Sequence, residues 1–277
     1  DQGIVEETRF AYSIVPGFKS YSELYGYGIW EIAGYWYILM WLCLGMIFIL
    51  LGISMRNAGM LNRIRLRTVI KENPKLSMSV ACFIILFFMT HLYIYKEVNI
   101  SGNFESTDQV CLRKADYEKK HFYLDCKAQL HYQYIELNID FFQSERKAEY
   151  SAELFLINRN ITPIDTISLS FPKFCQVESL EKNHFSLKVL SKDTLHNQYT
   201  YLLPSSVQQG ETVRLSLKAN KQYKGFTQDG DGGDPQLDLA FQGLWGNVKD
   251  YLPTIGFNMK NRLEKNRERK EYGLSIL

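Results

Sequence analysis

The five histidines are the side chains of this sequence best suited to bind a metal ion or to transfer a proton near neutral pH. They are spread along the chain, at His91, His121, His131, His184 and His196. No two of them are four residues apart, so the H-E-x-x-H pattern that places two zinc ligands on one helix face does not occur. The sequence also has no phosphate-binding loop and no G-x-S-x-G nucleophile motif. It therefore nominates no catalytic residue, no cofactor-binding residue and no metal ligand.

An acidic, glycine-rich segment resembles part of a cation site. It contains Asp229, Asp231 and Asp234. An EF-hand loop closes with an acidic ligand at its twelfth position, which counted from Asp229 is Ala240. A turn is therefore the favoured interpretation, and a partial calcium loop is the alternative.

The five cysteines divide between an apolar and a polar part of the chain. Cys43 and Cys82 fall in apolar stretches and are interpreted as packing residues, whereas Cys111, Cys126 and Cys175 lie where an oxidising compartment would permit disulfides. Cys111 and Cys126 suggest a pair by their spacing. If a helix connected them, their Cα atoms would be about 22 Å apart, and a disulfide tolerates about 7 Å. A disulfide between Cys111 and Cys126 is therefore possible only if the chain turns between them.

The overall composition is that of a folded protein with two unlike halves. Of 277 residues, 46% are apolar and 22% are charged, and the formal net charge is +2. These values exclude a disordered chain and give no basic face for nucleic acid. Because the chain begins with Asp1 and stops at Leu277 after a charged stretch, we expect it to be a segment of a longer polypeptide.

Two long uncharged stretches predict transmembrane helices. Ile32 to Met55 is 24 residues without a charged side chain, and at about 1.5 Å per residue it is about 36 Å long, enough to cross a hydrocarbon core of about 30 Å. The second stretch runs from about Leu76 to Tyr95. Two buried helices of a soluble domain are the alternative. His91, near the end of the second stretch, is interpreted as an interfacial histidine, with an intramembrane functional group as the alternative.

The charges around these stretches predict their orientation. The loop of residues 56–75 contains six basic residues and one acid, Glu72. Residues 1–31, before the first stretch, contain only Arg9 and Lys19 as basic residues. The positive-inside rule places this loop in the cytoplasm and everything after Tyr95 outside.

The second half of the chain predicts a helix followed by strands. Residues from Ser106 to about Phe122 are helix-compatible, and after Lys127 apolar residues alternate with polar ones. Six alternating runs separated by polar turns indicate an antiparallel sandwich with one wet face per sheet. The runs are 135–141, 150–156, 167–171, 185–189, 213–217 and 237–241.

The predicted fold class is therefore two transmembrane α-helices followed by a juxtamembrane helix and an all-β antiparallel sandwich. Three regions follow: a membrane region, residues 1–97, with spans at about 32–55 and 76–95; a juxtamembrane helical linker, residues 98–128; and an extracytoplasmic β-sandwich domain, residues 129–277.

Several short motifs, in this order along the chain, resemble a bacterial membrane protein family. They are Tyr25-Gly-Tyr-Gly, Arg63-Ile-Arg-Leu-Arg, Tyr93-Ile-Tyr-Lys-Glu-Val-Asn, Ala115-Asp-Tyr-Glu-Lys-Lys, Leu156-Ile-Asn-Arg-Asn-Ile-Thr-Pro-Ile-Asp, Lys224-Gly-Phe, Leu252-Pro-Thr-Ile-Gly-Phe-Asn and Arg269-Lys-Glu-Tyr-Gly-Leu. The family fuses an ABC-type transporter permease to an aminopeptidase N-like metallopeptidase. The resemblance implies that residues 129–277 are the amino-terminal, non-catalytic β domain of the peptidase region. It also implies that the zinc site lies in a catalytic domain absent from this chain.

The predicted function is a membrane-anchored segment of such a fusion, which contributes permease helices and the non-catalytic β domain. Whether the parent protein is a zinc aminopeptidase stays open. No cofactor is expected in this chain. The expected partners are the lipid bilayer, a separate ATPase subunit and a peptidase domain, with no nucleic acid. The expected location is the bacterial inner (plasma) membrane, with the β domain extracytoplasmic. The alternative is a non-enzymatic, membrane-anchored extracytoplasmic binding module.

Overall fold

The chain divides into two compact units. The computed structural model describes residues 23, 30–57, 74–226, 239–240, 243–244 and 247–277. The first unit comprises Asp1–Phe104 and Lys224–Gln228, and the second comprises Glu105–Tyr223 and Asp229–Leu277. The linker predicted at residues 98–128 is therefore divided between the two units, since its helix belongs to the second.

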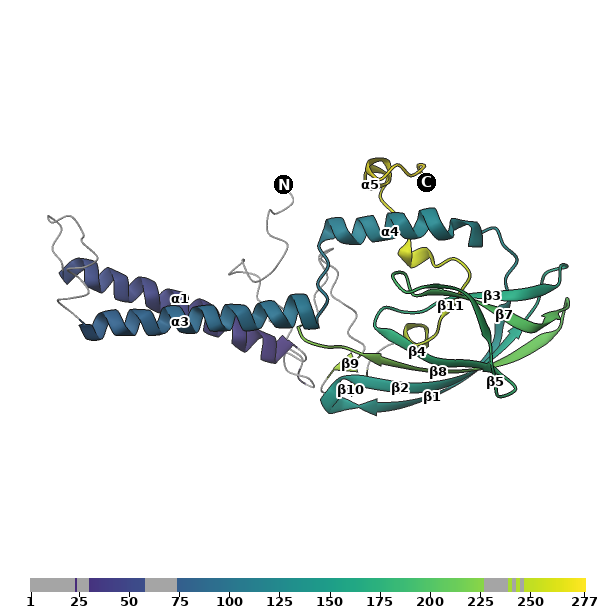
Figure 1. The fold of residues 1–277 in the computed structure, drawn as a ribbon, viewed down its shortest axis with the longest axis horizontal. Coiled ribbons are helices and arrows are strands. Elements are labelled where there is room, and N and C mark those ends of the chain that lie inside the picture. Colours follow the sequence, from purple (N-terminus) through teal and green to yellow (C-terminus); the bar gives the residue numbers. More distant parts are fainter. Residues whose placement is uncertain (1–22, 24–29, 58–73, 227–238, 241–242, 245–246) are drawn as a thin grey trace. The chain divides into compact units, whose positions relative to one another are not determined.

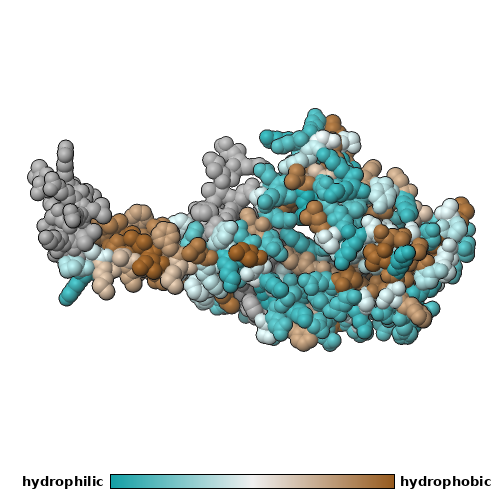
Figure 2. Space-filling view, viewed as in Figure 1, coloured by the Kyte–Doolittle hydropathy of each residue, from teal (hydrophilic) through white to brown (hydrophobic). Residues whose placement is uncertain are grey.

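The first unit is built on two long apolar helices, α1 (Trp30–Asn57) and α3 (Pro74–Tyr95), and α3 continues as the π-helical turn η2 (Lys96–Ser101). Both helices have the length and composition needed to cross a membrane. They pack through a small buried cluster, Tyr37, Met40, Ile94 and Val98. Most of the remaining apolar surface of the pair is exposed (Figure 2). The predicted helices 32–55 and 76–95 are therefore confirmed as helices.

Residues Lys224–Phe226 pack against the end of α3 within the first unit. The amide of Phe226 donates a hydrogen bond of 2.9 Å to the Glu97 carbonyl, and the Phe226 ring contacts the Tyr93 ring edge to face at 6.1 Å. Gly225, the residue before Phe226, has a φ of +61° and lies close to η2. A Cβ atom on this residue would overlap the Glu97 carbonyl oxygen. Glycine is required here for conformation and for space.

Replacing Gly225 with alanine should therefore release this segment from η2. We expect the amide of Phe226 to lose protection from hydrogen exchange in the full chain in detergent, because its acceptor can no longer be approached. Gly210→Ala is the matched control, since Gly210 also has a positive φ, +77°, but its Cβ would meet no atom within 4 Å. Unchanged Phe226 protection in Gly225→Ala would contradict this packing.

The second unit contains two antiparallel sheets (Figure 1). One has the strand order β1-β2-β8-β4-β5 and the other β11-β3-β7-β6, while β9 and β10 pair with each other. The strands are β1 (His131–Phe142), β2 (Lys147–Ile157), β3 (Ile164–Ser170), β4 (Cys175–Lys182), β5 (Phe185–Ser186), β6 (Lys188–Asp193), β7 (Gln198–Val207), β8 (Thr212–Gln222), β9 (Leu239–Ala240), β10 (Gly243–Leu244) and β11 (Thr254–Ile255).

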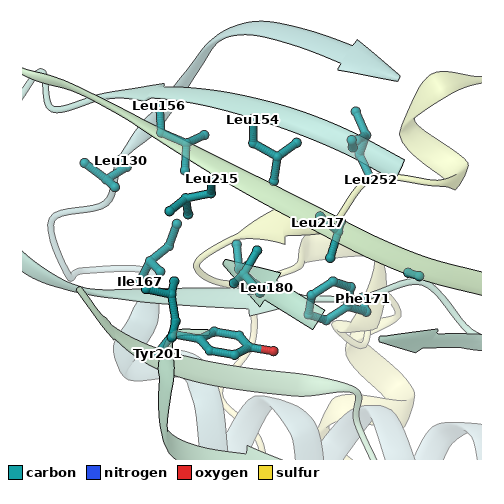
Figure 3. Packing of buried hydrophobic residues seen from close by; sticks show 14 of the residues in the cluster. Leu130, Leu154, Leu156, Ile167, Phe171, Leu180, Tyr201, Leu215, Leu217 and Leu252 are labelled. Carbon is teal, nitrogen blue, oxygen red and sulfur yellow. The ribbon is translucent and has the colours of Figure 1, made fainter. Parts of the chain in front are cut away.

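The core lies between the two larger sheets and follows from alternation of apolar residues. Along β2 and β8, every second side chain is buried, including Leu154 and Leu215, which are fully buried. These leucines face Ile167 of β3 and Tyr201 of β7 across the sandwich (Figure 3). Apolar residues on one face of each strand are thereby removed from water, which is the dominant stabilising contribution to such a fold.

Helix α4 (Thr107–His121) lies along the four-stranded sheet (Figure 1). It begins with a capping box, in which the Ser106 hydroxyl accepts from the Gln109 amide and the Gln109 side chain accepts from the Ser106 amide. The helix predicted from Ser106 to about Phe122 is confirmed. A second helix, α5 (Asn266–Glu271), has six residues. Short 3-10 turns lie between the elements: η3 (Phe122–Leu124), η4 (Gln143–Glu145), η5 (Val248–Asp250) and η6 (Met259–Asn261).

Some strands differ from the sequence-based expectation. β4 and β7 were not predicted, and in the predicted run 185–189 only Leu187 is buried, whereas Phe185 and Val189 are exposed. Of the run 237–241, only the two residues of β9 lie among the described residues.

Candidate functional site

Three of the motifs that carry the family resemblance meet around Tyr117 of α4. Its side chain is fully buried, and its hydroxyl accepts a 2.8 Å hydrogen bond from the Asn258 amide and donates one of 3.2 Å to Gln198 Oε1. The ring stacks on Phe257 with 5.2 Å between ring centres. Burial raises the pKa of the Tyr117 hydroxyl, so the group stays a neutral donor. Tyr117 thus joins α4 to β7 and to the segment after β11.

A buried ion pair joins the neighbouring residue of α4 to α5. The Arg269 guanidinium is 1% exposed and donates to both oxygens of Glu118, at 2.6 and 2.8 Å. It also donates to the carbonyls of Leu263 and Ser275. This bidentate geometry compensates the cost of removing both charges from water. The short C-terminal helix α5 is thus fixed to α4 through this arginine.

Two histidines that are far apart in the sequence lie together on the other side of Tyr117. His121 Nε2 is 3.0 Å from Asp193 Oδ2, and His196 Nε2 is 2.9 Å from Asp116 Oδ2. The two imidazole rings are 5.8 Å apart. We call these four residues the His–Asp cluster. Residues 116 and 121 come from α4, residue 193 ends β6, and residue 196 lies in the turn between β6 and β7.

The charges of the His–Asp cluster stabilise its aspartates as carboxylates. Hydrogen bonds from Lys120 and His196 lower the pKa of Asp116. Burial acts to raise the pKa of Asp193, but hydrogen bonds from the His121 side chain and the His196 amide outweigh it and lower that pKa. Each contact becomes a full ion pair when the imidazole is protonated. The cluster therefore holds α4 against the turn between β6 and β7.

The His–Asp cluster lacks the other parts of a hydrolytic site. In the described part of the chain, no hydroxyl or thiol is hydrogen-bonded to either imidazole, so no activated nucleophile is present there. The described residues also contain no group of three or more His, Cys, Asp or Glu side chains that could hold a metal ion. The contacts that the structure does show for the cluster are packing contacts between α4 and the end of β6.

Acid should weaken the packing of α4 through these aspartates. Because the pKa of Asp116 and of Asp193 is lower in the folded state, their stabilisation is complete above the ordinary Asp value of about 3.9 and is lost as the pH falls through the folded values. We expect the free energy of unfolding to fall when the pH is lowered from about 5 to about 3. The Asp193→Asn variant should show a smaller fall, measured by urea unfolding. An equal fall would show that the cluster contributes nothing.

The other residues singled out by the sequence do not join this cluster. His91 is in α3, His131 begins β1, and His184 is in the turn between β4 and β5. All five cysteines are free thiols, with Cys111 buried in α4 and Cys126 exposed. The acidic segment with Asp229, Asp231 and Asp234 lies outside the described residues.

The asparagine motif after β2 also has a packing role. Asn158 is fully buried, and its side-chain amide donates to the carbonyls of Thr162 and Val207 at 2.9 and 2.8 Å. Its oxygen accepts from the Asn160 amide, and the Asn160 side chain donates to the Gln129 carbonyl. These bonds satisfy the backbone of a tight turn that crosses between the two sheets.

A cleft of about 1060 Å³ opens at the end of the second unit near the start of α4. Among its lining residues, Glu105 accepts hydrogen bonds from Arg113 and Lys173. Burial acts to raise the pKa of Glu105, but these two cations lower it overall. One carboxylate therefore pairs with two cations at the rim of the cleft, and the formal charges of these three side chains sum to +1.

Comparison with known proteins finds low structural similarity and no match by sequence. No family model and no curated protein matches the chain. Among solved structures, a two-domain M1 zinc metallopeptidase mutant bound to L-tryptophan is 20% identical, with a TM-score of 0.30. The match covers 35% of this chain and 21% of the metallopeptidase chain. The M1 zinc metallopeptidase from Deinococcus radiodurans is 20% identical with a TM-score of 0.29, covering 34% and 20%.

The chitin-binding domain of a chitinase from Pyrococcus furiosus is 14% identical with a TM-score of 0.20, covering 35% of this chain and 86% of its own. M1 metallopeptidases are thus among the structural neighbours, but this chain spans only about a fifth of their length. At TM-scores this low, none of these likenesses carries a conclusion about activity.

Proposed function

We propose that this chain is a membrane-anchored segment of an ABC permease–aminopeptidase fusion. In this proposal, α1 and α3 are permease helices in a bacterial inner membrane. The β unit is the extracytoplasmic, non-catalytic domain of a zinc metallopeptidase region. The zinc site would lie in a catalytic domain outside this sequence, and a separate ATPase would drive the transporter.

The exposed apolar surface of α1 and α3 carries the membrane part of this proposal. Phe48 is 65% exposed and Met89 is 63% exposed, and they are two of many large apolar side chains on these helices with little protein cover. Exposing such side chains to water costs about 25 cal/mol per Å² of apolar surface. Lipid removes that cost, and helices of this length satisfy their own backbone hydrogen bonds. The basic loop at residues 56–75 supports a cytoplasmic side for their connection.

The packing around Tyr117 supports the peptidase part of the proposal. The motifs at 252–258 and 269–274 both contact the motif at 115–120, through Tyr117–Asn258 and Glu118–Arg269. All three carry the family resemblance. Motifs that are far apart in sequence and contact one helix depend on that helix for their packing. We therefore assign them a scaffold role in the β domain, consistent with a domain that holds no catalytic residue.

The alternative is an extracytoplasmic binding module without a peptidase, in which α1 and α3 also anchor the chain in the membrane. Sequencing the flanking reading frame separates the two functions: an H-E-x-x-H motif with a downstream glutamate after Leu277 supports the fusion, and a stop codon there supports the binding module. Membrane insertion itself is tested by extracting membranes that contain the full chain with alkaline carbonate. We expect the chain to remain in the pellet, and its release into the supernatant would contradict the proposal.

A further inference from the structure

β1 is an edge strand of the five-stranded sheet, with no strand beyond it among the described residues. It is 12 residues long and pairs with β2 along its whole length, from His131 opposite Ile157 to Phe142 opposite Lys147. On its other side, no backbone hydrogen bond joins residues 131–142 to any residue that the structure describes. A long unpaired edge of this kind is a template for another strand.

Like charges face each other across β1 and β2 on the outer side of this sheet. Glu136 lies directly opposite Glu153, and Asp140 lies directly opposite Glu149. Acids in direct cross-strand register repel each other. A cation beside either acid of such a pair offsets this repulsion.

The nearby cations form their ion pairs with the acids of β2, although Glu136 also contributes to raising the pKa of Arg214. Arg214 donates to Glu153 at 2.9 Å, and Lys147 forms an ion pair with Glu149. Within the described part of the chain, Glu136 and Asp140 have no ion-pair partner. Both side chains are exposed, four residues apart on the outward face of the free edge. Among the described residues, the edge therefore has two exposed carboxylates that form no ion pair of their own.

The inward face of β1 has the complementary apolar pattern. Its four apolar side chains pack on the core but stay partly exposed, whereas the inward residues of the neighbouring β2 are fully buried. They are Ile135, Leu137, Ile139 and Phe141. The apolar layer of the sandwich thus continues to the edge without a strand to cover its last row.

We propose that β1 is a docking edge for an extended, basic segment of a partner protein, which adds to the five-stranded sheet as a sixth strand. The segment has Lys or Arg at two positions four residues apart, opposite Glu136 and Asp140. Apolar side chains stand next to those cations, opposite Leu137 and Ile139. Both requirements are met by one strand, because side chains alternate between the two faces.

The same charges exclude a second copy of this chain as the occupant. Two β1 strands side by side would bring the Glu136 and Asp140 side chains of both copies to one edge without any cation in either strand to neutralise them. The proposal is independent of whether a peptidase domain follows. It requires only the free edge and its charges.

The test uses the full chain in detergent and a synthetic peptide with Lys at two positions four residues apart, Val next to each Lys on the inner side, and polar residues elsewhere. Binding is measured by fluorescence anisotropy, and hydrogen exchange is followed at residues 131–142. We expect saturable binding and new amide protection in β1. In the Glu136→Gln/Asp140→Asn variant we expect binding to weaken by about tenfold, since two exposed ion pairs are lost.

Two controls separate strand addition from general attraction to a basic peptide. Glu178→Gln removes an exposed acid from β4, away from this edge, and should leave binding unchanged. A peptide of the same composition with its two lysines adjacent should bind weakly and protect no β1 amide. The proposal is overturned if the peptide fails to bind, or if binding leaves β1 amides unprotected. It is also overturned if Glu136→Gln/Asp140→Asn binds equally well, or if the chain dimerises through β1.

Discussion

Replacing Arg269 with methionine should lower the free energy of unfolding of the second unit by about 3–5 kcal/mol. The change removes one member of a buried ion pair and leaves the Glu118 carboxylate, which is 6% exposed, without its bidentate partner. Arg262 approaches Glu118 only to 3.7 Å and cannot replace both hydrogen bonds. Urea unfolding of the full chain, followed by circular dichroism, measures the loss.

The neighbouring Arg267 provides a matched control. It is on the same short helix but is exposed, so Arg267→Met should change stability by less than about 0.5 kcal/mol. A double variant, Glu118→Leu/Arg269→Met, should recover much of the loss because it removes both buried charges. Equal stability of Arg269→Met and Arg267→Met would show that the pair does not hold α5 on α4.

Replacing Leu215 with aspartate should leave the β unit unfolded at room temperature. Leu215 is fully buried at the centre of β8 and lies opposite Leu154 of β2 in the register of the sheet. A carboxylate at this position would be buried in the apolar core without a cation to pair with, and the cost of several kcal/mol is a large part of the 5–15 kcal/mol that stabilises a typical domain. We expect loss of the cooperative thermal transition in circular dichroism.

Lys218→Asp is the control, because Lys218 lies on the same strand with its side chain exposed on the opposite face. It introduces the same carboxylate without burying it and should melt close to the parent protein. If Leu215→Asp kept a cooperative transition at the parent temperature, the inward orientation of β8 would be wrong.

Local signals in the sequence predicted the elements with strong periodicity. The uncharged stretches became α1 and α3, and the alternation in β1, β2 and β8 placed Leu154 and Leu215 correctly in the core. β4 was missed because its sequence, Cys175–Lys182, contains charged and polar residues on both faces. β7 was missed because Pro204 and two serines interrupt its apolar pattern.

Contacts between distant residues could not be predicted from spacing. His121 and Asp193 are 72 positions apart, and Glu118 and Arg269 are 151 positions apart. Sequence spacing described the histidines as dispersed, yet the fold brings two of them within 5.8 Å. The charged sequence of α5 is typical of a solvent-exposed helix. It does not show that Arg269 donates hydrogen bonds to a buried glutamate, Glu118, on another helix.

The sidedness of the chain in intact cells tests the proposed membrane anchor most directly. Cys82 and Cys126 are first replaced with serine because both are exposed. A cysteine is then placed at Ser205, which is exposed in the β unit, or at Asn62, in the basic loop. We predict that a membrane-impermeant maleimide labels the Ser205→Cys variant in intact cells and labels the Asn62→Cys variant only after permeabilisation. Labelling of both positions, or of Asn62→Cys alone, would contradict an extracytoplasmic β domain anchored by α1 and α3.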